Sequence, residues 1–194
     1  MTKLPAYIKN SNIEVPQFIL DSDLLSSALF VAAKMHEGQY RKFDGSHYIV
    51  HPLEVCTLVR EYTNDELTLA AALLHDVVED TDYTVADVEL VFGSTVALLT
   101  SALTDESATI PEMKTLPRKD RKAHDRNRLA DFDDYRVHTV KLCDIVSNTR
   151  DWEHMEPKYR KLYFTEKKAL VTALTAGDEA LRSRLFEHFE TVEY

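Results

Sequence analysis

Residues 67–81 read LTLAAALLHDVVEDT and contain the most apolar segment of the chain. The run 67–78 predicts a helix that is buried on most of its surface. The pair His75-Asp76 lies near the end of this helix, where an ionised carboxylate is costly to bury unless a partner such as a metal ion compensates it. Helical spacing places Glu79 one turn after His75 and Asp80 one turn after Asp76. We therefore expect four polar groups close together at one helix end.

Two further segments contain side chains of the same kind. His51 follows the apolar residues 48–50, at the expected start of a helix, and Asp144 interrupts the apolar segment 140–146. Two imidazoles and two carboxylates suit Mn, Fe, Co or Zn better than Ca. Such an ion lowers the pKa of bound water and holds a phosphoryl oxygen. Glu79 and Asp80 would then move protons or orient the attacking water.

Each of these pieces also has a structural interpretation on its own. His51 could cap a helix, Asp144 could pair with a buried arginine, and Glu79-Asp80 could form a solvated helix end. A single His-Asp pair is a weak signal by itself. The combination over about ninety residues is what favours a metal-dependent hydrolase.

Helical periodicity continues outward in both directions. It predicts one all-α domain over residues 1–194, with about seven or eight helices and no strand. Asp21 or Ser22 would cap a helix at 24–35, Gly38 to Val50 would form a loop, and Pro52 would take the first position of the next helix. The remaining segments, in order, are helices near 84–93 and 96–103, an exposed loop at 104–117, a basic helix at 118–129, a segment at 137–146, and C-terminal helices at 159–174 and 179–189.

Charge and cysteine content restrict the function classes. The formal net charge is −10, so the acidic surface disfavours binding to nucleic acid. No apolar run approaches the roughly 20 residues of a membrane span. The two cysteines suggest no disulfide framework, and the N-terminus lacks the apolar stretch of a signal peptide, so we expect a cytoplasmic protein. Local basic segments at 41–42 and 118–128 suit a small polyanion as ligand. The sequence indicates no oligomeric state.

The segments 33–42, 48–52, 71–81 and 140–144, with Phe92-Gly93, Asn148 and Arg150, together resemble the HD hydrolase domain of RelA/SpoT proteins. The order and spacing match over roughly residues 24–152. The resemblance implies the all-α HD-domain fold and removal of the 3′-pyrophosphate from ppGpp and pppGpp with one Mn²⁺ ion. Because the chain is too short for the synthetase and regulatory domains of the long forms, it resembles the stand-alone small alarmone hydrolases.

The resemblance also implies a role for each matching position. Metal ligands would be His51, His75, Asp76 and Asp144, and the catalytic pair would be Glu79 and Asp80, with Glu79 nearest the attacking water. The nucleotide would be bound by Arg41, Lys42, Asn148 and Tyr163, with phosphate contacts from Arg121 or Lys122. The basic helix could equally be a solvated charged face, and His36 is expected to play a structural or supporting role.

Some positions depart from the family pattern. Cys143 occupies a position where alanine is commoner, and residues 145–149 differ from those of the long forms. These departures leave the metal ligands untouched but affect the nucleoside pocket. Two alternatives to guanine alarmones therefore stay open: an adenosine alarmone, or removal of a phosphate from NADPH. A nucleotide-binding regulator without catalysis is a third alternative, against which the Glu79-Asp80 pair argues.

Overall fold

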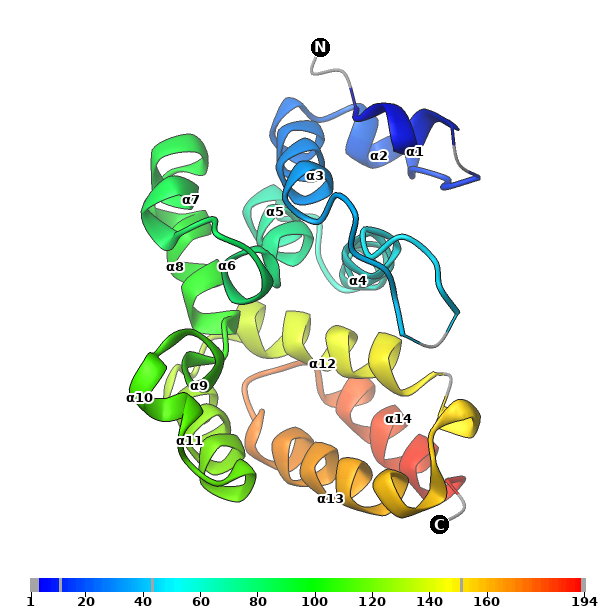
Figure 1. Cartoon of the computed structure of the whole chain (residues 1–194), viewed down its shortest axis with the longest axis vertical. Coiled ribbons are helices and arrows are strands. Elements are labelled where there is room, and N and C mark those ends of the chain that lie inside the picture. Colours follow the sequence, from blue (N-terminus) through cyan, green and yellow to red (C-terminus); the bar gives the residue numbers. More distant parts are fainter. Residues whose placement is uncertain (1–3, 11, 43, 151, 193–194) are drawn as a thin grey trace. The chain divides into compact units, whose positions relative to one another are not determined.

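The computed structural model describes residues 4–10, 12–42, 44–150 and 152–192 (Figure 1). Within these ranges the chain forms fourteen α-helices and one short 3₁₀ helix, with an isolated β-bridge between Tyr40 and His47 and no strand. The prediction of an all-α fold is therefore confirmed for this part of the chain. Backbone contacts divide the chain into two compact units, Met1–Thr104 and Asp105–Tyr194.

The first unit contains eight α-helices in its described residues. They are α1 (Ala6–Asn10), α2 (Gln17–Leu20), α3 (Asp23–Met35), α4 (Val50–Val59), α5 (Glu66–Leu74), α6 (Val77–Asp80), α7 (Val85–Phe92) and α8 (Ser94–Leu103). Helix α5 packs against α3, α4 and α8, and α7 packs against α8. All residues of α5 from Thr68 to Leu74 are buried, which confirms the predicted core helix.

Side-chain caps set several helix ends in this unit. Ser22 accepts a hydrogen bond from the Leu25 amide and so begins α3, as predicted. Thr84 and Asp87 form a reciprocal capping box at the start of α7. Gly93 ends that helix with a φ of +83°, a conformation that favours glycine. Helix α4 begins at Val50, two residues before the predicted Pro52.

The predicted single helix through 67–78 is wrong at its C-terminal end. Helix α5 ends at Leu74, and a one-turn helix, α6, begins at Val77. His75 and Asp76 form the junction between them. The Asp80 amide still donates to the Asp76 carbonyl at 2.9 Å, so these two residues do lie one turn apart. The apolar pattern predicted a continuous helix because Val77 and Val78 extend it past the junction.

The second unit contains the remaining helices. They are α9 (Glu106–Thr109), α10 (Pro111–Lys114), α11 (Arg118–Asp131), α12 (Tyr135–Thr149), the 3₁₀ helix η1 (Trp152–His154), α13 (Pro157–Ala173) and α14 (Glu179–Glu190). Helix α13 packs against α11 and α14, and α12 packs against α14. Most of α12 is buried, including His138, Lys141 and Asp144.

The prediction of an exposed loop at 104–117 is wrong in its first half. Thr104, Asp105 and Ser107 are buried, and two one-turn helices occupy the segment. The buried carboxylate of Asp125, on α11, accepts hydrogen bonds from the Ser107 amide and hydroxyl. This contact, which the polar sequence did not indicate, holds α9 against α11.

The predicted number of helices was too low, because the short helices α1, α2, α6, α9 and α10 lack a long apolar pattern. The longer helices lie close to their predicted ranges. Among the described residues, no helix is both long and apolar enough to cross a membrane.

Candidate metal centre

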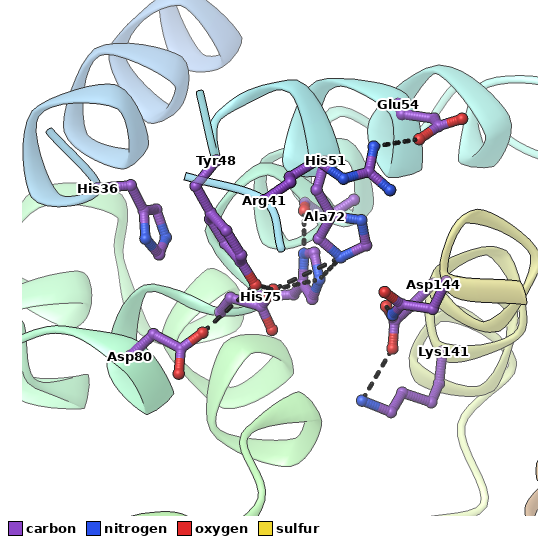
Figure 2. Close-up of polar contacts among 12 residues, drawn as sticks. His36, Arg41, Tyr48, His51, Glu54, Ala72, His75, Asp80, Lys141 and Asp144 are labelled. Atoms are coloured by element: carbon purple, nitrogen blue, oxygen red, sulfur yellow. Dashed lines mark hydrogen bonds and ion pairs between the residues drawn. The ribbon is translucent and has the colours of Figure 1, made fainter. Parts of the chain in front are cut away.

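His51, His75 and Asp76 bring three ligand atoms together in the first unit. The two histidines are labelled in Figure 2. The two Nε2 atoms lie 3.2 Å apart, and Asp76 Oδ2 lies 3.1 Å from Nε2 of His75 and 3.5 Å from Nε2 of His51. Both histidines are buried, and the Asp76 side chain is 15% exposed. Of the four predicted metal ligands, these three form one group that could hold a metal ion.

The chemistry of this group fits a divalent ion. The Nδ1 atom of His75 lies 2.8 Å from the Ala72 carbonyl. Since a carbonyl only accepts, a neutral His75 ring that donates from Nδ1 would keep its Nε2 lone pair for a metal ion. Ligand atoms bound to one ion at about 2.0–2.2 Å lie about 3.0–3.5 Å from one another, as these do. The break between α5 and α6 gives two successive residues the room to present their side chains to this point.

Tyr48 connects this group to the predicted catalytic pair. Its hydroxyl lies 2.6 Å from Oδ2 of Asp76 and 3.3 Å from Oδ2 of Asp80. Partial burial of the Asp80 carboxyl group raises its pKa, and the nearby Asp76 carboxylate raises it further. Asp80 is therefore held where it could exchange a proton close to the metal ligands. Glu79, the other member of the pair, is half-buried on α6.

His36 packs against the Tyr48 ring. Its ring lies 4.7 Å from the Tyr48 ring, measured between centroids, and Nδ1 lies 2.8 Å from Oε1 of Gln39. The amide nitrogen of Gln39 in turn donates to the Asp80 carbonyl at 3.1 Å. Burial lowers the pKa of His36. This neutral, buried ring is consistent with the supporting role expected from the sequence.

The predicted nucleotide-binding pair lies in the loop between α3 and α4. Arg41 Nη1 lies 3.4 Å from Oε2 of Glu54, with both side chains largely buried (Figure 2). Lys42 is exposed. The loop is pinned by the Tyr40–His47 bridge and by a hydrogen bond of 2.8 Å from the Arg41 amide to the Ser46 carbonyl.

A cavity of about 550 Å³ lies beside this loop, lined mainly by apolar surface from residues 12–16 and 46–57. Glu54 and His47 are among its lining residues, while the three ligand residues of the metal centre are not. The cavity is therefore distinct from the candidate metal centre.

Asp144, the fourth predicted ligand, lies on α12 in the second unit. Its Oδ2 accepts from Lys141 Nζ at 3.0 Å, and its Oδ1 accepts from the Asn148 side-chain amide. The Tyr163 hydroxyl, on α13, lies 3.5 Å from the Asn148 carbonyl. Burial, followed by the nearby Asp144 carboxylate, raises the pKa of Tyr163. Three residues predicted separately as ligand or substrate contacts thus form one connected group within this unit.

The two predicted phosphate contacts on α11 have different surroundings. Lys122 Nζ lies 2.8 Å from Oδ2 of the buried Asp105, while Arg121 is half-buried. The sequence predicted no role for Tyr48, Lys141 or Lys167. Tyr48 and Lys141 lie within the segments that suggested the family, but only the folded chain shows that their polar atoms contact Asp76 and Asp144.

A protein-family comparison matches residues 28–177 to the HD domain family. A relative from Mus musculus, named guanosine-3′,5′-bis(diphosphate) 3′-pyrophosphohydrolase, is 34% identical over 87% of this chain and 94% of its own length. A solved structure is described as a metazoan orthologue of SpoT that hydrolyses ppGpp. It superposes with a TM-score of 0.77 at 33% identity, over 88% of this chain and 96% of the other.

Longer bacterial proteins are also similar. The bifunctional (p)ppGpp synthase/hydrolase of Escherichia coli is 37% identical over 71% of this chain but only 19% of its own length. The chain thus spans about a fifth of the length of these relatives. A structure from Listeria monocytogenes shares the fold, with a TM-score of 0.58 at 24% identity.

Proposed function

Since the chain belongs to the HD domain family, we propose that it is a manganese-dependent hydrolase that removes the 3′-pyrophosphate from ppGpp and pppGpp. The observation that carries the proposal is the convergence of His51, His75 and Asp76, with Asp80 held nearby by Tyr48. The similarity to a mouse 3′-pyrophosphohydrolase over nearly the whole of its length supports the choice of substrate.

We further propose that Asp144 completes the ligand set and that residues 1–194 form a single HD domain. The family match supports this, because it runs from residue 28 to residue 177 and so includes segments of both units. A mixed set of two imidazoles and two carboxylates suits Mn²⁺ as well as related ions. When bound, such an ion supplies Lewis-acid activation of water and neutralises phosphate charge.

The reaction consumes one water and breaks the bond between the 3′-oxygen and the adjacent phosphorus. The products are GDP or GTP and pyrophosphate. Glu79 would accept a proton from the attacking water, and Asp80 would return one to the leaving 3′-oxygen. The raised pKa of Asp80 supports this role, because a carboxyl group that holds its proton more firmly is a better general acid.

The remaining predicted contacts would bind the nucleotide. Arg41 presents a planar cation suited to stacking against a base, and Lys42 lies next to it with its side chain exposed. Asn148 and Tyr163 would contact the nucleoside from the second unit, and Arg121 or Lys122 the phosphates. We expect a single small-molecule nucleotide substrate and a cytoplasmic location.

The test is the release of pyrophosphate from ppGpp by the purified protein, with Mn²⁺ and with excess chelator. We expect release that depends on the metal and is lost in His75→Ala. ppApp and NADPH are assayed in parallel under the same conditions. Equal or faster turnover of an adenine substrate would reject guanine specificity. Saturable binding of ppGpp without product, despite bound Mn²⁺, would reject catalysis altogether.

A further inference from the structure

Three lysines in the second unit surround two carboxylates. Lys122 pairs with Asp105 at 2.8 Å, and Lys141 pairs with Asp144 at 3.0 Å. The third, Lys167 on α13, lies within electrostatic range of both pairs: burial and the two other lysines lower the pKa of its ammonium group, while Asp144 and Asp105 raise it. The group therefore holds one cation more than it holds anions. Because a half-buried surplus cation is unfavourable, this excess of positive charge favours an anionic ligand.

Among the described residues, no carboxylate forms an ion pair with Lys167, in contrast to the neighbouring cations. Lys168 Nζ lies 2.7 Å from Glu190, and Arg118 makes two hydrogen bonds to Glu166, at 2.8 and 2.9 Å. Lys167 Nζ lies over the Tyr163 ring, 5.2 Å from its centroid. Its surroundings therefore leave the ammonium group available to a ligand.

Lys167 lies next to the proposed nucleotide-binding residues of this unit, Asn148 and Tyr163. Lys167 lies one helical turn after Tyr163, which places the two residues on the same face of α13. Tyr163 contacts Asn148, and Asn148 contacts Asp144. Lys167 is thus joined through contacts of this unit to the carboxylate proposed as a metal ligand.

Metal binding at Asp144 would increase the excess of positive charge in this group. A carboxylate that coordinates a divalent ion shares its charge with that ion and compensates nearby ammonium groups less well. Lys141 and Lys167 would then both favour an additional anion. In a nucleoside polyphosphate, the anionic groups nearest the metal ligands belong to the diphosphate that reacts.

We propose that Lys167, together with Lys141, forms a subsite for the 3′-diphosphate of the substrate, which leaves as pyrophosphate. This inference rests on the proposed function for the identity of the substrate. The chemistry recognised is a diphosphate, by two ammonium groups that act as point charges. The subsite does not recognise the base or the 5′-phosphates.

The first test compares Lys167→Met with the matched variant Lys168→Met, which removes a charge from the next residue. Steady-state rates are measured on ppGpp and pppGpp. Loss of one charge-assisted contact raises KM about 10- to 100-fold in Lys167→Met, by the same factor for both substrates, with a smaller change in kcat. Lys168→Met keeps the wild-type constants, and Lys167→Arg recovers most of the lost affinity. Unchanged constants in Lys167→Met, or effects that differ between the two substrates, would overturn the proposal.

The second test does not depend on turnover. Inorganic pyrophosphate is added to the metal-free protein in the presence of chelator, and the shift in melting temperature is recorded, with GDP as the comparison ligand. We expect pyrophosphate to stabilise wild type and Lys168→Met but not Lys167→Met, and GDP to affect all three alike. An equal pyrophosphate shift in Lys167→Met would refute the subsite. If wild type fails to hydrolyse ppGpp yet shows the expected shifts, the proposed function falls and the diphosphate subsite stands.

Discussion

Tyr48 and Asp76 are joined by a hydrogen bond of 2.6 Å that ties the loop before α4 to the junction between α5 and α6. The oxygen that accepts this bond also lies 3.1 Å from Nε2 of His75. Tyr48 therefore fixes the orientation of a proposed metal ligand without being a ligand itself. Such supporting contacts typically change metal affinity or activity about 10- to 100-fold when they are removed.

We predict that Tyr48→Phe weakens Mn²⁺ binding by about tenfold and lowers kcat by a similar factor or more. The phenyl ring preserves packing against His36 but cannot orient either Asp76 or Asp80. Metal affinity is measured by titration into the metal-free protein, and kcat at saturating metal. The comparison variant is Tyr83→Phe, which alters a tyrosine on the loop before α7. Wild-type metal affinity and kcat in Tyr48→Phe would show that the hydrogen bond has no positioning role.

Metal should stabilise the folded protein. A ligand present at 100 times its Kd stabilises the native state by about 2.7 kcal/mol. We expect Mn²⁺ to raise the melting temperature of wild type and of His124→Ala, whose imidazole pairs with Glu106 on the surface. His75→Ala should lose the increase, because one of three converging ligand atoms is gone. An undiminished increase in His75→Ala would place the stabilising ion elsewhere.

Asp125 should be one of the more important polar residues for stability in the second unit. Its carboxylate accepts two hydrogen bonds from Ser107, and Asp125 is 3% exposed. Asp125→Ala leaves the Ser107 donors unpaired, so we expect a loss of about 1–3 kcal/mol in the free energy of unfolding. Urea denaturation measures the loss, with exposed Asp120→Ala as the control. If Asp125→Ala lowered the free energy of unfolding no more than Asp120→Ala does, α9 would not be held by this contact.

The stability contribution of Asp105 should depend on pH in a defined direction. Burial opposes ionisation of Asp105, but Lys141, Lys122 and Lys167 outweigh it and lower the pKa of its carboxyl group. A carboxyl group whose pKa is lower in the folded state stabilises the protein fully above its unfolded pKa of about 3.9 and loses this effect as the pH falls through the folded value.

Asp105→Asn should therefore lower the free energy of unfolding by about 1–3 kcal/mol at pH 7, because it removes a charged partner of Lys122. The difference from wild type should stay constant down to about pH 4 and shrink below it. Denaturation curves from pH 7 to pH 3 measure it. A difference that grows on acidification would have the wrong sign for this explanation.

Helices α3, α7 and α14 were predictable because their apolar positions recur at helical spacing and form one buried side. The break after Leu74 could not be predicted, since the residues around His75 and Asp76 keep the apolar pattern of a continuous helix. The buried start of the segment after α8 was missed for a different reason. Ser107 is polar, and only its contact with Asp125 across the unit explains its burial.

Three proposed metal ligands could be identified from sequence because histidine and aspartate are conspicuous in apolar segments, and the structure brings these three together. Residues that act through contacts between helices gave no such signal. Gly177 is an example: a Cβ atom there would lie 2.6 Å from Leu142 Cδ1 and 3.1 Å from His138 Cβ, so the chain after α13 approaches α12 at a point where a side chain does not fit. Nothing in the neighbouring sequence indicates that approach.

The Tyr40–His47 bridge joins the two ends of the loop that contains Arg41, so the loop can be replaced as a unit. The ends of this loop are held together by a second contact as well, because the Tyr48 amide donates to the Gln39 carbonyl at 3.0 Å. If Arg41 and Lys42 bind the nucleotide as proposed, replacements within the loop change nucleotide recognition while His51 keeps its place at the start of α4. Substrate specificity would then diverge through exchange of this loop, without any change to the proposed metal ligands.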